Sequence, residues 1–369
     1  MKISRLAQAG ALAAVAAVAL AGCASSSTSD SSASASATAS IDASLTGTIT
    51  AGGSSAQANA QTAWAAAFTS VATGVTINYD KTLGSGGGRT NFIAGSLDFA
   101  GSDAPLSADE TTEAAATYTS GAVNLPIYLD GVAVAYNSSI SDSLNLSTET
   151  IAKIFSGQIT NWSDDAITAD NGGTALADQA INVVVRSDSS GTANNFTNFL
   201  YASDPTDWTW AGSGTFPADI TGVDAQKGGG AVATEIAGVA GSIGYLDNSA
   251  IIDGVSAASV NGIELTSDTV AEAFTAGATE NSNGVDGDLS LKFDYDAINS
   301  DADAYPIPLL SYAIIPLEFT DTENADATIS YLQFIATSTG QQVAAAKANS
   351  VPLPQSILDE VQATLATVK

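Results

Sequence analysis

Short apolar segments alternate with longer stretches of helical character from Leu45 to the end of the chain. This pattern predicts strands over residues 48–51, 74–79, 97–101 and 181–185. It predicts helices over residues 57–70, 88–94, 193–201, 329–339 and 355–368. Such alternation is typical of an α/β chain with mostly parallel sheets. Small polar loops follow the predicted strands, and open α/β sheets bind ligands at the carboxyl ends of their strands.

Two extended segments that contain proline interrupt this alternation. Residues 122–136 include Pro126, and residues 304–315 include Pro306 and Pro308. We interpret these segments as the places where the chain crosses between two domains. The prediction is a discontinuous first domain, residues 45–125 plus 305–369, and a second domain, residues 126–304. A chain of 369 residues is long enough for two domains of ordinary size.

Residues 1–23 have the layout of a secretory signal peptide. Lys2 and Arg5 precede a small-apolar stretch over residues 9–20, and Leu-Ala-Gly leads into Cys23. This ending resembles the lipobox of bacterial lipoproteins, which implies cleavage before Cys23 and a lipid anchor, palmitate included, on that residue. The alternative is an ordinary cleaved signal, or an uncleaved anchor, with a cysteine there by chance. We expect a lipoprotein on the extracytoplasmic face of the cell membrane.

Residues 24–44 consist almost wholly of Ser, Ala and Thr, and Ile41 is the one large side chain among them. Such a segment buries too little apolar surface to order itself, so we expect a disordered tether. No later stretch is apolar enough over sufficient length to span a bilayer.

The composition excludes several classes of function. Asp and Glu number 39 against 10 Lys and Arg, and the net charge of −29 opposes binding to nucleic acid or to an anionic membrane surface. The chain has no His and only one Cys. These counts rule out Ser-His-Asp and Cys-His catalysis, histidine zinc sites, thiolate clusters and intramolecular disulfides.

The most informative loop follows the predicted strand over residues 181–185. Arg186 stands at the strand end, and Ser190, Gly191 and Thr192 lead into the next predicted helix. Free N–H groups and hydroxyls at a helix start favour an anion, and an arginine fork matches a tetrahedral oxyanion. The alternative is a simple helix cap beside a surface arginine. However, Arg186 and Arg89 are the only arginines after the signal segment.

Two more loops offer donors of the same kind. Ser55 and Ala56 precede the first predicted helix, and Ser85 lies within the Gly-Ser-Gly-Gly-Gly loop before the second. Either loop alone could be an ordinary cap or a flexible turn. Three such helix starts in one α/β chain favour an anion site.

Several segments resemble the phosphate-binding protein of the bacterial phosphate ABC transporter, and the similarity runs in order over nearly all of residues 46–369. The segments that carry it are residues 49–55, 84–88, 97–107, 154–162, 186–192 and 241–245. The resemblance implies a type II periplasmic-binding-protein fold, with the ligand cleft between two domains joined by hinge strands. It implies a monomer that binds inorganic phosphate without reaction, metal or cofactor and delivers it to transmembrane permease subunits.

The resemblance also assigns the phosphate ligands. From the first domain it implies Ser55, Ala56, Ser85 and Asp103, and from the second it implies Arg186, Ser190, Gly191 and Thr192. It implies that Asp188 orients Arg186. Thr-Phe is usual in the family where Ser55-Ala56 stands here, but the hydroxyl and the N–H are kept. Arg89 lies just past the glycines, where we expect a solvated helix side chain rather than a ligand.

Asp103 explains how such a site chooses its anion. A carboxylate repels an anion unless the anion donates a proton, which phosphate does near neutral pH and sulfate does not. A site built around a substrate proton rejects an analogue without it by about 10⁴–10⁵-fold. The alternative is that Asp103 simply caps a helix before Ala104-Pro105-Leu106.

The sequence also permits two other functions. A secreted phosphatase or glycosidase could use paired carboxylates such as Asp164 and Asp165, or Asp301 and Asp303, although 39 acidic residues make chance pairs common. A receptor for another oxyanion could reuse the same fold. Glycines 228–230 could line the cleft or start a helix.

Overall fold

The computed structural model describes residues 41–319, 322 and 324–369. Within this part of the chain, nine strands form one mixed sheet. Eight of them lie in the spatial order β2 (Gly74–Asp80), β1 (Thr46–Gly53), β3 (Phe99–Ser102), β13 (Pro308–Pro316), β4 (Ala122–Asn137), β8 (Ser242–Asp247), β6 (Asn182–Arg186) and β7 (Asp224–Gln226). The ninth strand, β9 (Val255–Ala257), pairs with β4.

Parallel pairing occurs at both ends of this sheet, and antiparallel pairing occurs in its middle. β1 pairs in parallel with β2 and β3, and β6 pairs in parallel with β7 and β8. The long strands β13 and β4 pair antiparallel with each other, and β13 also pairs antiparallel with β3 and β4 with β8. The α/β class is confirmed, but the sheet is mixed rather than mostly parallel.

Twelve α-helices accompany the strands in the described residues. They are α1 (Ala58–Thr69), α2 (Gly84–Ile93), α3 (Ala108–Thr117), α4 (Thr148–Phe155), α5 (Asp165–Asp170), α6 (Gly191–Ser203), α7 (Gly229–Gly238), α8 (Ser267–Gly277), α9 (Tyr295–Ser300), α10 (Ala325–Ile335), α11 (Ser338–Ala348) and α12 (Gln355–Leu365). Two small sheets pair β5 (Asn145–Leu146) with β10 (Ser259–Val260), and β11 (Ala278–Glu280) with β12 (Leu291–Phe293). None of these helices is long and apolar enough to cross a membrane.

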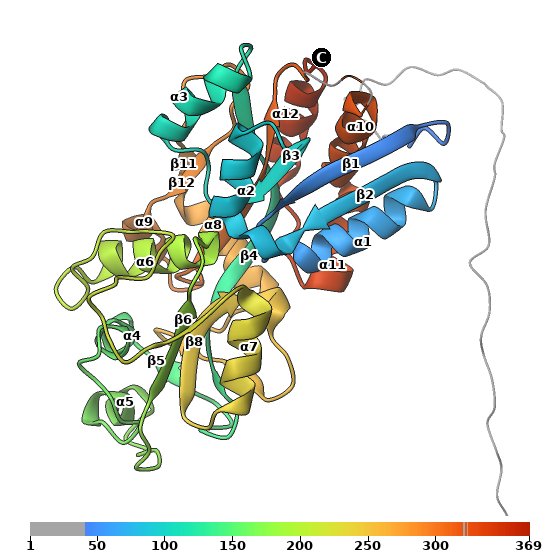
Figure 1. Cartoon of the computed structure of the whole chain (residues 1–369). Helices are drawn as coiled ribbons and strands as arrows, with labels where there is room; N and C mark the ends of the chain where they lie inside the picture. The colour runs from blue at the N-terminus through green and yellow to red at the C-terminus, as the bar shows by residue number, and fades with distance from the viewer. Residues whose placement is uncertain (1–40, 320–321, 323) are drawn as a thin grey trace, which may run out of the picture. The chain divides into compact units, whose positions relative to one another are not determined.

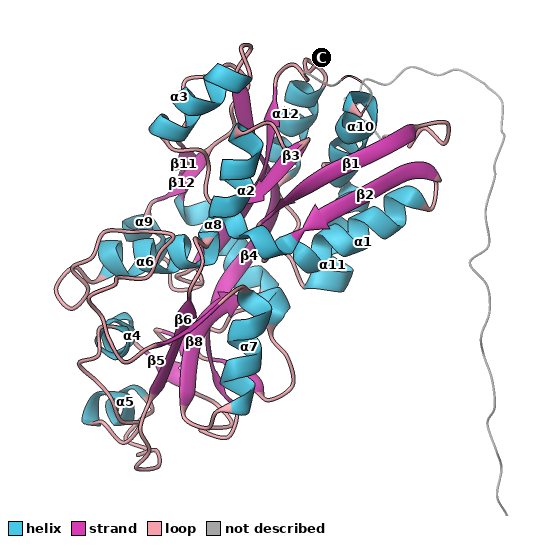
Figure 2. Cartoon of the chain, in the orientation of Figure 1, coloured by secondary structure: helices cyan, strands magenta, loops and turns pink. Residues whose placement is uncertain are grey.

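The elements gather around the two ends of the large sheet (Figures 1 and 2). We call β1–β3 with α1–α3 and α10–α12 the first lobe, and β6–β8 with α4–α7 the second lobe. β4 runs between them (Figure 1), and the whole of β13 pairs with it. The described residues form one compact unit, and the predicted domain boundaries stay a prediction.

Two local predictions about helices are wrong. The glycine-rich segment 84–88 is the start of α2 rather than a loop before it. The helix predicted over residues 329–339 is interrupted, because α10 ends at Ile335 and Thr337 caps the start of α11 by accepting a hydrogen bond from Gly340 N–H.

The signal peptide over residues 1–23, its Cys23 and most of the predicted tether lie outside the described residues. Of the tether, residues 41–44 are described, and Ile41 packs against the main hydrophobic core.

Candidate functional site

The predicted ligand residues come from strand ends that face the boundary between the lobes. Ser55 follows β1 and Asp103 follows β3, and these two strands are parallel neighbours. Arg186 is the last residue of β6, whose carboxyl end points toward the first lobe (Figure 1). Parallel strands deliver their carboxyl ends to one edge of a sheet. The fold therefore brings ligand candidates from both lobes to a common boundary.

Asp103 is held by hydroxyl groups from three separate segments. Its carboxylate accepts hydrogen bonds from Ser54 Oγ, from Ser311 Oγ at 2.6 Å and from Ser85 Oγ at 3.2 Å. Asp103 is 4% exposed, and this burial raises the pKa of its carboxyl although the hydroxyls and Arg186 oppose the rise. The cap of α3 is Ser107, so the interpretation of Asp103 as a helix cap is wrong.

Arg186 is buried and already oriented. Its Nε and Nη2 atoms bind the two carboxylate oxygens of Asp188 at 2.8 and 2.5 Å, the bidentate geometry that fixes a guanidinium plane. Burial alone would raise the pKa of Asp188. The hydrogen bond from Arg186 and its positive charge outweigh burial and hold this pKa below its usual range. Arg186 N–H donates to the hydroxyl of Tyr245 at 3.1 Å. Nη1 remains directed at the first lobe, 3.3 Å from Ser55 Oγ.

The start of α6 supplies the other second-lobe candidates. Ser190 caps the helix by accepting a hydrogen bond from Ala193 N–H at 3.2 Å. A Cβ atom on Gly191 would lie 2.5 Å from Asp103 Cβ and 2.7 Å from Ser85 Oγ, so only glycine permits this approach. Thr192 Oγ1 is buried and has no hydrogen-bond partner within the described residues. Its hydroxyl is therefore able to bind a ligand.

Glycines on α2 allow the lobes to touch. Cβ atoms on Gly84 and Gly86 would lie 2.5 Å from Asp188 Oδ2 and 2.2 Å from Ser189 Oγ. Gly86 N–H donates to the carbonyl of Ser189 at 3.1 Å. The glycine-rich segment thus brings Ser85, in the first turn of α2, next to the loop that carries Asp188.

The first loop differs in detail from what the sequence predicts. Ser55 Oγ lies at the boundary and accepts hydrogen bonds from Arg186 and from Gly229 N–H, each at 3.3 Å. Ala56 is buried, but its N–H donates to Ser54 Oγ at 3.1 Å. The sequence analysis missed Ser54, which contacts Asp103 directly.

Arg89 has a structural contact that the sequence analysis did not predict. Its Nε binds Glu110 Oε1 at 2.8 Å, and its Nη1 donates to Ser102 Oγ at 3.0 Å. The side chain is only 16% exposed, so the expectation of a solvated side chain is wrong. Glu110 completes the capping box of α3, so Arg89 ties α2 to the start of α3 and to the end of β3.

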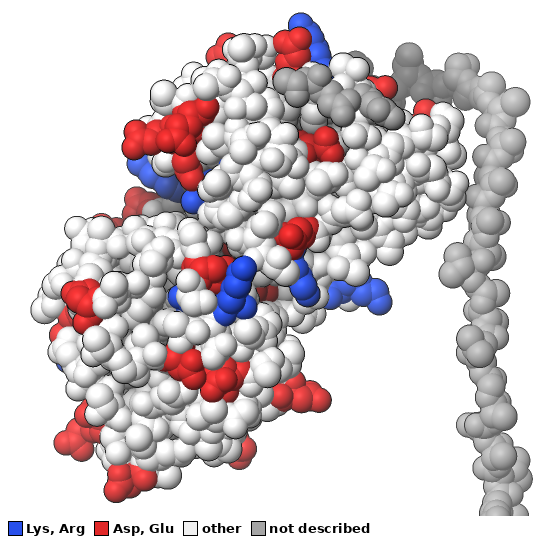
Figure 3. Space-filling model, in the orientation of Figure 1, with Lys and Arg blue, Asp and Glu red and all other residues white. Residues whose placement is uncertain are grey.

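A cavity of about 410 Å³ lies at the boundary between the lobes, and we call it the mouth cavity. Ser55 and Lys81 line it from the first lobe, and Lys227 and Gly228–Gly230 line it from the second. The sequence left open whether these glycines line the cleft or start a helix. They do both, because they line this cavity while Gly228 caps α7 and Gly229 and Gly230 begin it. On the face shown in Figure 3, several of the few basic side chains lie along this boundary. Positive charge next to the mouth reduces the repulsion that an anion meets from the acidic surface.

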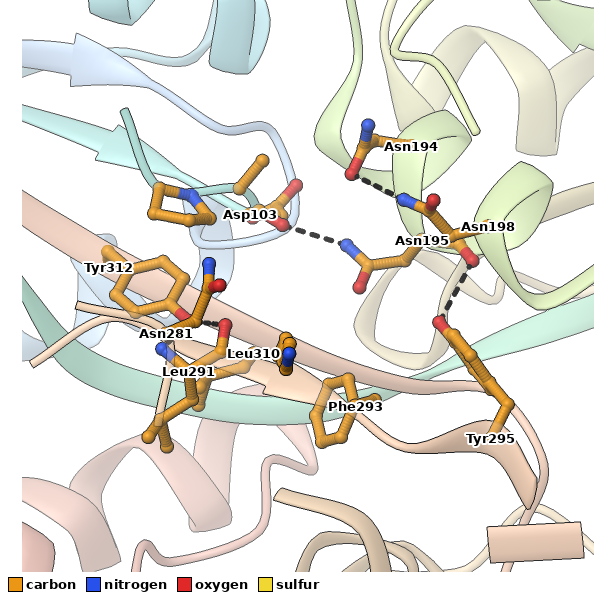
Figure 4. Close-up of a pocket in the computed structure, with 13 residues that line it drawn as sticks. Asp103, Asn194, Asn195, Asn198, Asn281, Leu291, Phe293, Tyr295, Leu310 and Tyr312 are labelled. Atoms are coloured by element: carbon orange, nitrogen blue, oxygen red, sulfur yellow. Dashed lines mark hydrogen bonds between the residues drawn. The ribbon is translucent and has the colours of Figure 1, made fainter. Parts of the chain in front are cut away.

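A second cavity, of about 240 Å³, is lined by Asp103, Asn195 and Tyr295 (Figure 4). Asn195 from α6 donates to the Asp103 carbonyl at 2.8 Å, and Tyr295 donates to the Asn195 carbonyl at 3.4 Å. These contacts link the backbone of Asp103 to the second lobe. No group of three or more Asp, Glu, His or Cys residues that could hold a metal ion occurs in the described part of the chain.

The sequence analysis also missed Asp247, the last residue of β8. It is 1% exposed, and burial together with the charge of Asp103 raises its pKa to about 6, against the opposing effects of Ser249 and Arg186. The sequence contains a signal for it, because Asp247 follows the family-like segment 241–245 by two residues and stands at the carboxyl end of β8.

The comparisons with known proteins define the class first. Residues 32–339 match the model of the PBP superfamily domain, which makes the chain a member of the periplasmic-binding-protein class. A phosphate-binding protein from Stenotrophomonas maltophilia has the same fold, with a TM-score of 0.69, 23% identity, and coverage of 86% of this chain and 93% of that one.

Curated relatives define the family more narrowly. The chain is 33% identical over 315 residues to the phosphate-binding protein PstS 3 of Mycobacterium tuberculosis, covering 84% of this chain and 82% of the relative. It is 31% identical over 315 residues to the phosphate-binding protein PstS of Xylella fastidiosa, covering 82% and 81%. The chain belongs to the PstS family of phosphate-binding proteins, and its resemblance to that family is confirmed.

Proposed function

We propose that this protein binds inorganic phosphate and delivers it, unchanged, to the permease subunits of an ABC-type phosphate importer. Membership of the PstS family supports this function, and the family is one of binding proteins for transport rather than of enzymes. Family membership therefore disfavours the alternative of a secreted phosphatase, since a transport binding protein holds the ion without hydrolysing an ester.

One observation in the structure carries the proposal. The Asp103 carboxylate, fixed by three hydroxyls, lies against the start of α6, where Thr192 has a buried hydroxyl without a partner. An anion bound here would receive hydrogen bonds from neutral donors and from Arg186, while its own P–OH group donates to Asp103. The ligands in this proposal are Ser55, Ala56, Ser85, Asp103, Arg186, Ser190, Gly191 and Thr192, with Asp188 holding Arg186 in place.

The location of the ligands also gives the signal for transport. Because the donors belong to two lobes, binding one ion between them stabilises a closed arrangement through β4 and β13. The hinge would fall near residues 125–127 and 304–309, between the two predicted domains. A closed monomer with bound phosphate is then the form that the permease recognises.

Calorimetric titration of the mature protein with phosphate, sulfate and molybdate tests this function. We expect phosphate to bind and the other two anions to bind at least about 10³-fold more weakly. Thr192→Val, which removes only the hydroxyl, is expected to weaken phosphate binding about tenfold. Thr112→Val, the same exchange on the exposed face of α3, serves as the control. Equal affinity for sulfate and phosphate, or no binding of phosphate, contradicts the proposal.

The proposal includes export and anchoring. Cleavage before Cys23 would remove residues 1–22, and lipid on the new N-terminal Cys23 with a tether over residues 24–44 would hold the binding protein at the extracytoplasmic face of the membrane. The mass of the N-terminal peptide from membrane-extracted protein tests this, since an unmodified Cys23 contradicts the anchor.

A further inference from the structure

Asp247 stands at the end of a strand that also leads to the proposed phosphate site. β8 ends at Asp247 and pairs in parallel with β6, which ends at Arg186. Parallel strands present the residues at their carboxyl ends on one side of the sheet. The two side chains are therefore brought to the same edge, Arg186 as a donor and Asp247 as an acid.

One oxygen of Asp247 has a partner and the other has none. Oδ1 accepts a hydrogen bond from Ser249 Oγ at 2.6 Å. Oδ2 is buried and has no hydrogen-bond partner within the described residues. A buried, unpartnered carboxylate oxygen is costly, and natural structures keep such groups chiefly where they bind something.

The free oxygen lies near Gly229 and Ser55, at the boundary between the lobes. The point where a Cβ atom on Gly229 would stand is 3.1 Å from Asp247 Oδ2 and 3.6 Å from Ser55 Oγ. Ser55 Oγ in turn accepts hydrogen bonds from Gly229 N–H and from Arg186 Nη1. Asp247 Oδ2 thus lies near Ser55, which itself contacts Gly229 and Arg186 of the second lobe.

We propose that Asp247 is a second carboxyl ligand of the phosphate site, and that it makes binding of HPO₄²⁻ take up one proton from solvent. This inference rests on the proposed function and extends it. Asp103 accepts the proton that HPO₄²⁻ already carries. An ionised Asp247 would repel the same ion, so a second proton must lie between Oδ2 and a phosphate oxygen. The bound complex then holds two protons, one from the ion and one from water.

The other charged and titratable groups near Asp247 agree with this assignment. Asp103, after β3, raises the pKa of Asp247 through its charge, and Arg186 on β6 lowers it. On β4, Asp130 is itself buried and its pKa is raised by burial and by Asp247, while Tyr128 donates to Asp130 Oδ2 at 3.0 Å. Asp130 has partners for both oxygens, because Gly131 N–H donates to Oδ1. Among these acids, only Asp247 keeps a free oxygen beside the ligand groups.

Calorimetry in two buffers of different ionisation enthalpy counts the protons. At about pH 8.5, where free phosphate is HPO₄²⁻ and Asp247 is ionised, we expect about one proton taken up per phosphate bound. The dissociation constant should then rise about tenfold per pH unit. In Asp247→Asn the uptake should fall to near zero and the dissociation constant should become nearly independent of pH. The variant should consequently bind phosphate more tightly than the wild type at high pH. Asp253→Asn, an identical exchange at an exposed position nearby, should behave as the wild type.

The outcomes separate this inference from the function on which it rests. Binding by the wild type without proton uptake, or unchanged uptake in Asp247→Asn, overturns the role of Asp247 and leaves phosphate binding intact. Absence of phosphate binding in wild type and variants at every pH contradicts the proposed function instead. If Asp247→Asn does not fold, Ser249→Ala provides the second test. Losing the Ser249 hydrogen bond should move the onset of proton uptake to higher pH, and an unchanged onset overturns the proposal.

Discussion

Two buried aspartates follow strand ends in the two lobes, and they differ in the hydrogen bonds that they receive. Asp103, after β3, accepts from three hydroxyls that belong to the end of β1, to α2 and to β13. Asp247, at the end of β8, accepts from one hydroxyl only two residues further along the chain. Burial raises the pKa of both carboxyls.

The difference shows that burial alone does not decide what an acid does in an anion site. Three donors fix both oxygens of Asp103, so its carboxylate is an oriented acceptor before any ion arrives. One donor leaves Asp247 Oδ2 without a partner, so its protonation responds to the ion that binds. On this basis Asp103 would choose the kind of anion, and Asp247 would set how binding depends on pH.

Asp103→Asn tests the first half of this comparison and should have the largest effect. Replacing the carboxylate with an amide removes the repulsion that excludes sulfate. We expect the preference for phosphate over sulfate to fall by about 10³-fold or more, with the amide donating to the fully ionised anion. Titration of phosphate against a series of sulfate concentrations measures it.

The control for this experiment is again Asp253→Asn, which changes one exposed acid and should leave the preference unaltered. Thermal unfolding of each variant shows whether the site is still folded. If sulfate competes equally in Asp103→Asn and in the wild type, Asp103 does not select phosphate by accepting a hydrogen bond from its proton.

Local sequence was sufficient to predict Arg186 as a ligand candidate and to place Asp103 in a ligand loop, whereas the role of Asp103 came from the resemblance to the family. Each follows a short apolar strand, and the loop that contains it has the small polar residues typical of a ligand loop. The pairing of Arg186 with Asp188 is also local, since the two residues are two positions apart. Such signals lie within a few residues of one another and need no knowledge of the fold.

Contacts between distant segments were beyond the sequence. Ser311 lies 208 residues from Asp103 and reaches it only because β13 pairs with β3. Glycine disfavours helix, so the start of α2 could not be predicted from residues 84–88. It is helical because α2 packs closely on β1, where a Cβ on Gly88 would lie 2.6 Å from Gly53 Cα. The family-like segment 241–245 pointed toward Asp247, but only the strand order placed it beside the strand that carries Arg186.

The second half of the comparison predicts a smaller effect, on stability rather than on ligand choice. The pKa of Asp247 is about 6 in the folded protein, whereas an exposed aspartate titrates near 3.9. At pH values between about 4 and about 6, Asp247 therefore holds more proton in the folded state than in the unfolded state. The free energy of unfolding should therefore fall as pH rises from about 4 to about 6, by up to about 3 kcal/mol from this residue.

Asp247→Asn removes this contribution while Asp103 and the other acids remain in both proteins. The difference in unfolding free energy between variant and wild type should thus shift in favour of the variant by about 1–3 kcal/mol from pH 4 to pH 7, and then level off. Urea unfolding at a series of pH values without phosphate measures it. For Asp253→Asn the difference should stay constant. If the curves of Asp247→Asn and wild type run parallel across this range, the pKa of Asp247 is not raised in the folded protein, and the proposed difference between Asp247 and Asp103 is wrong.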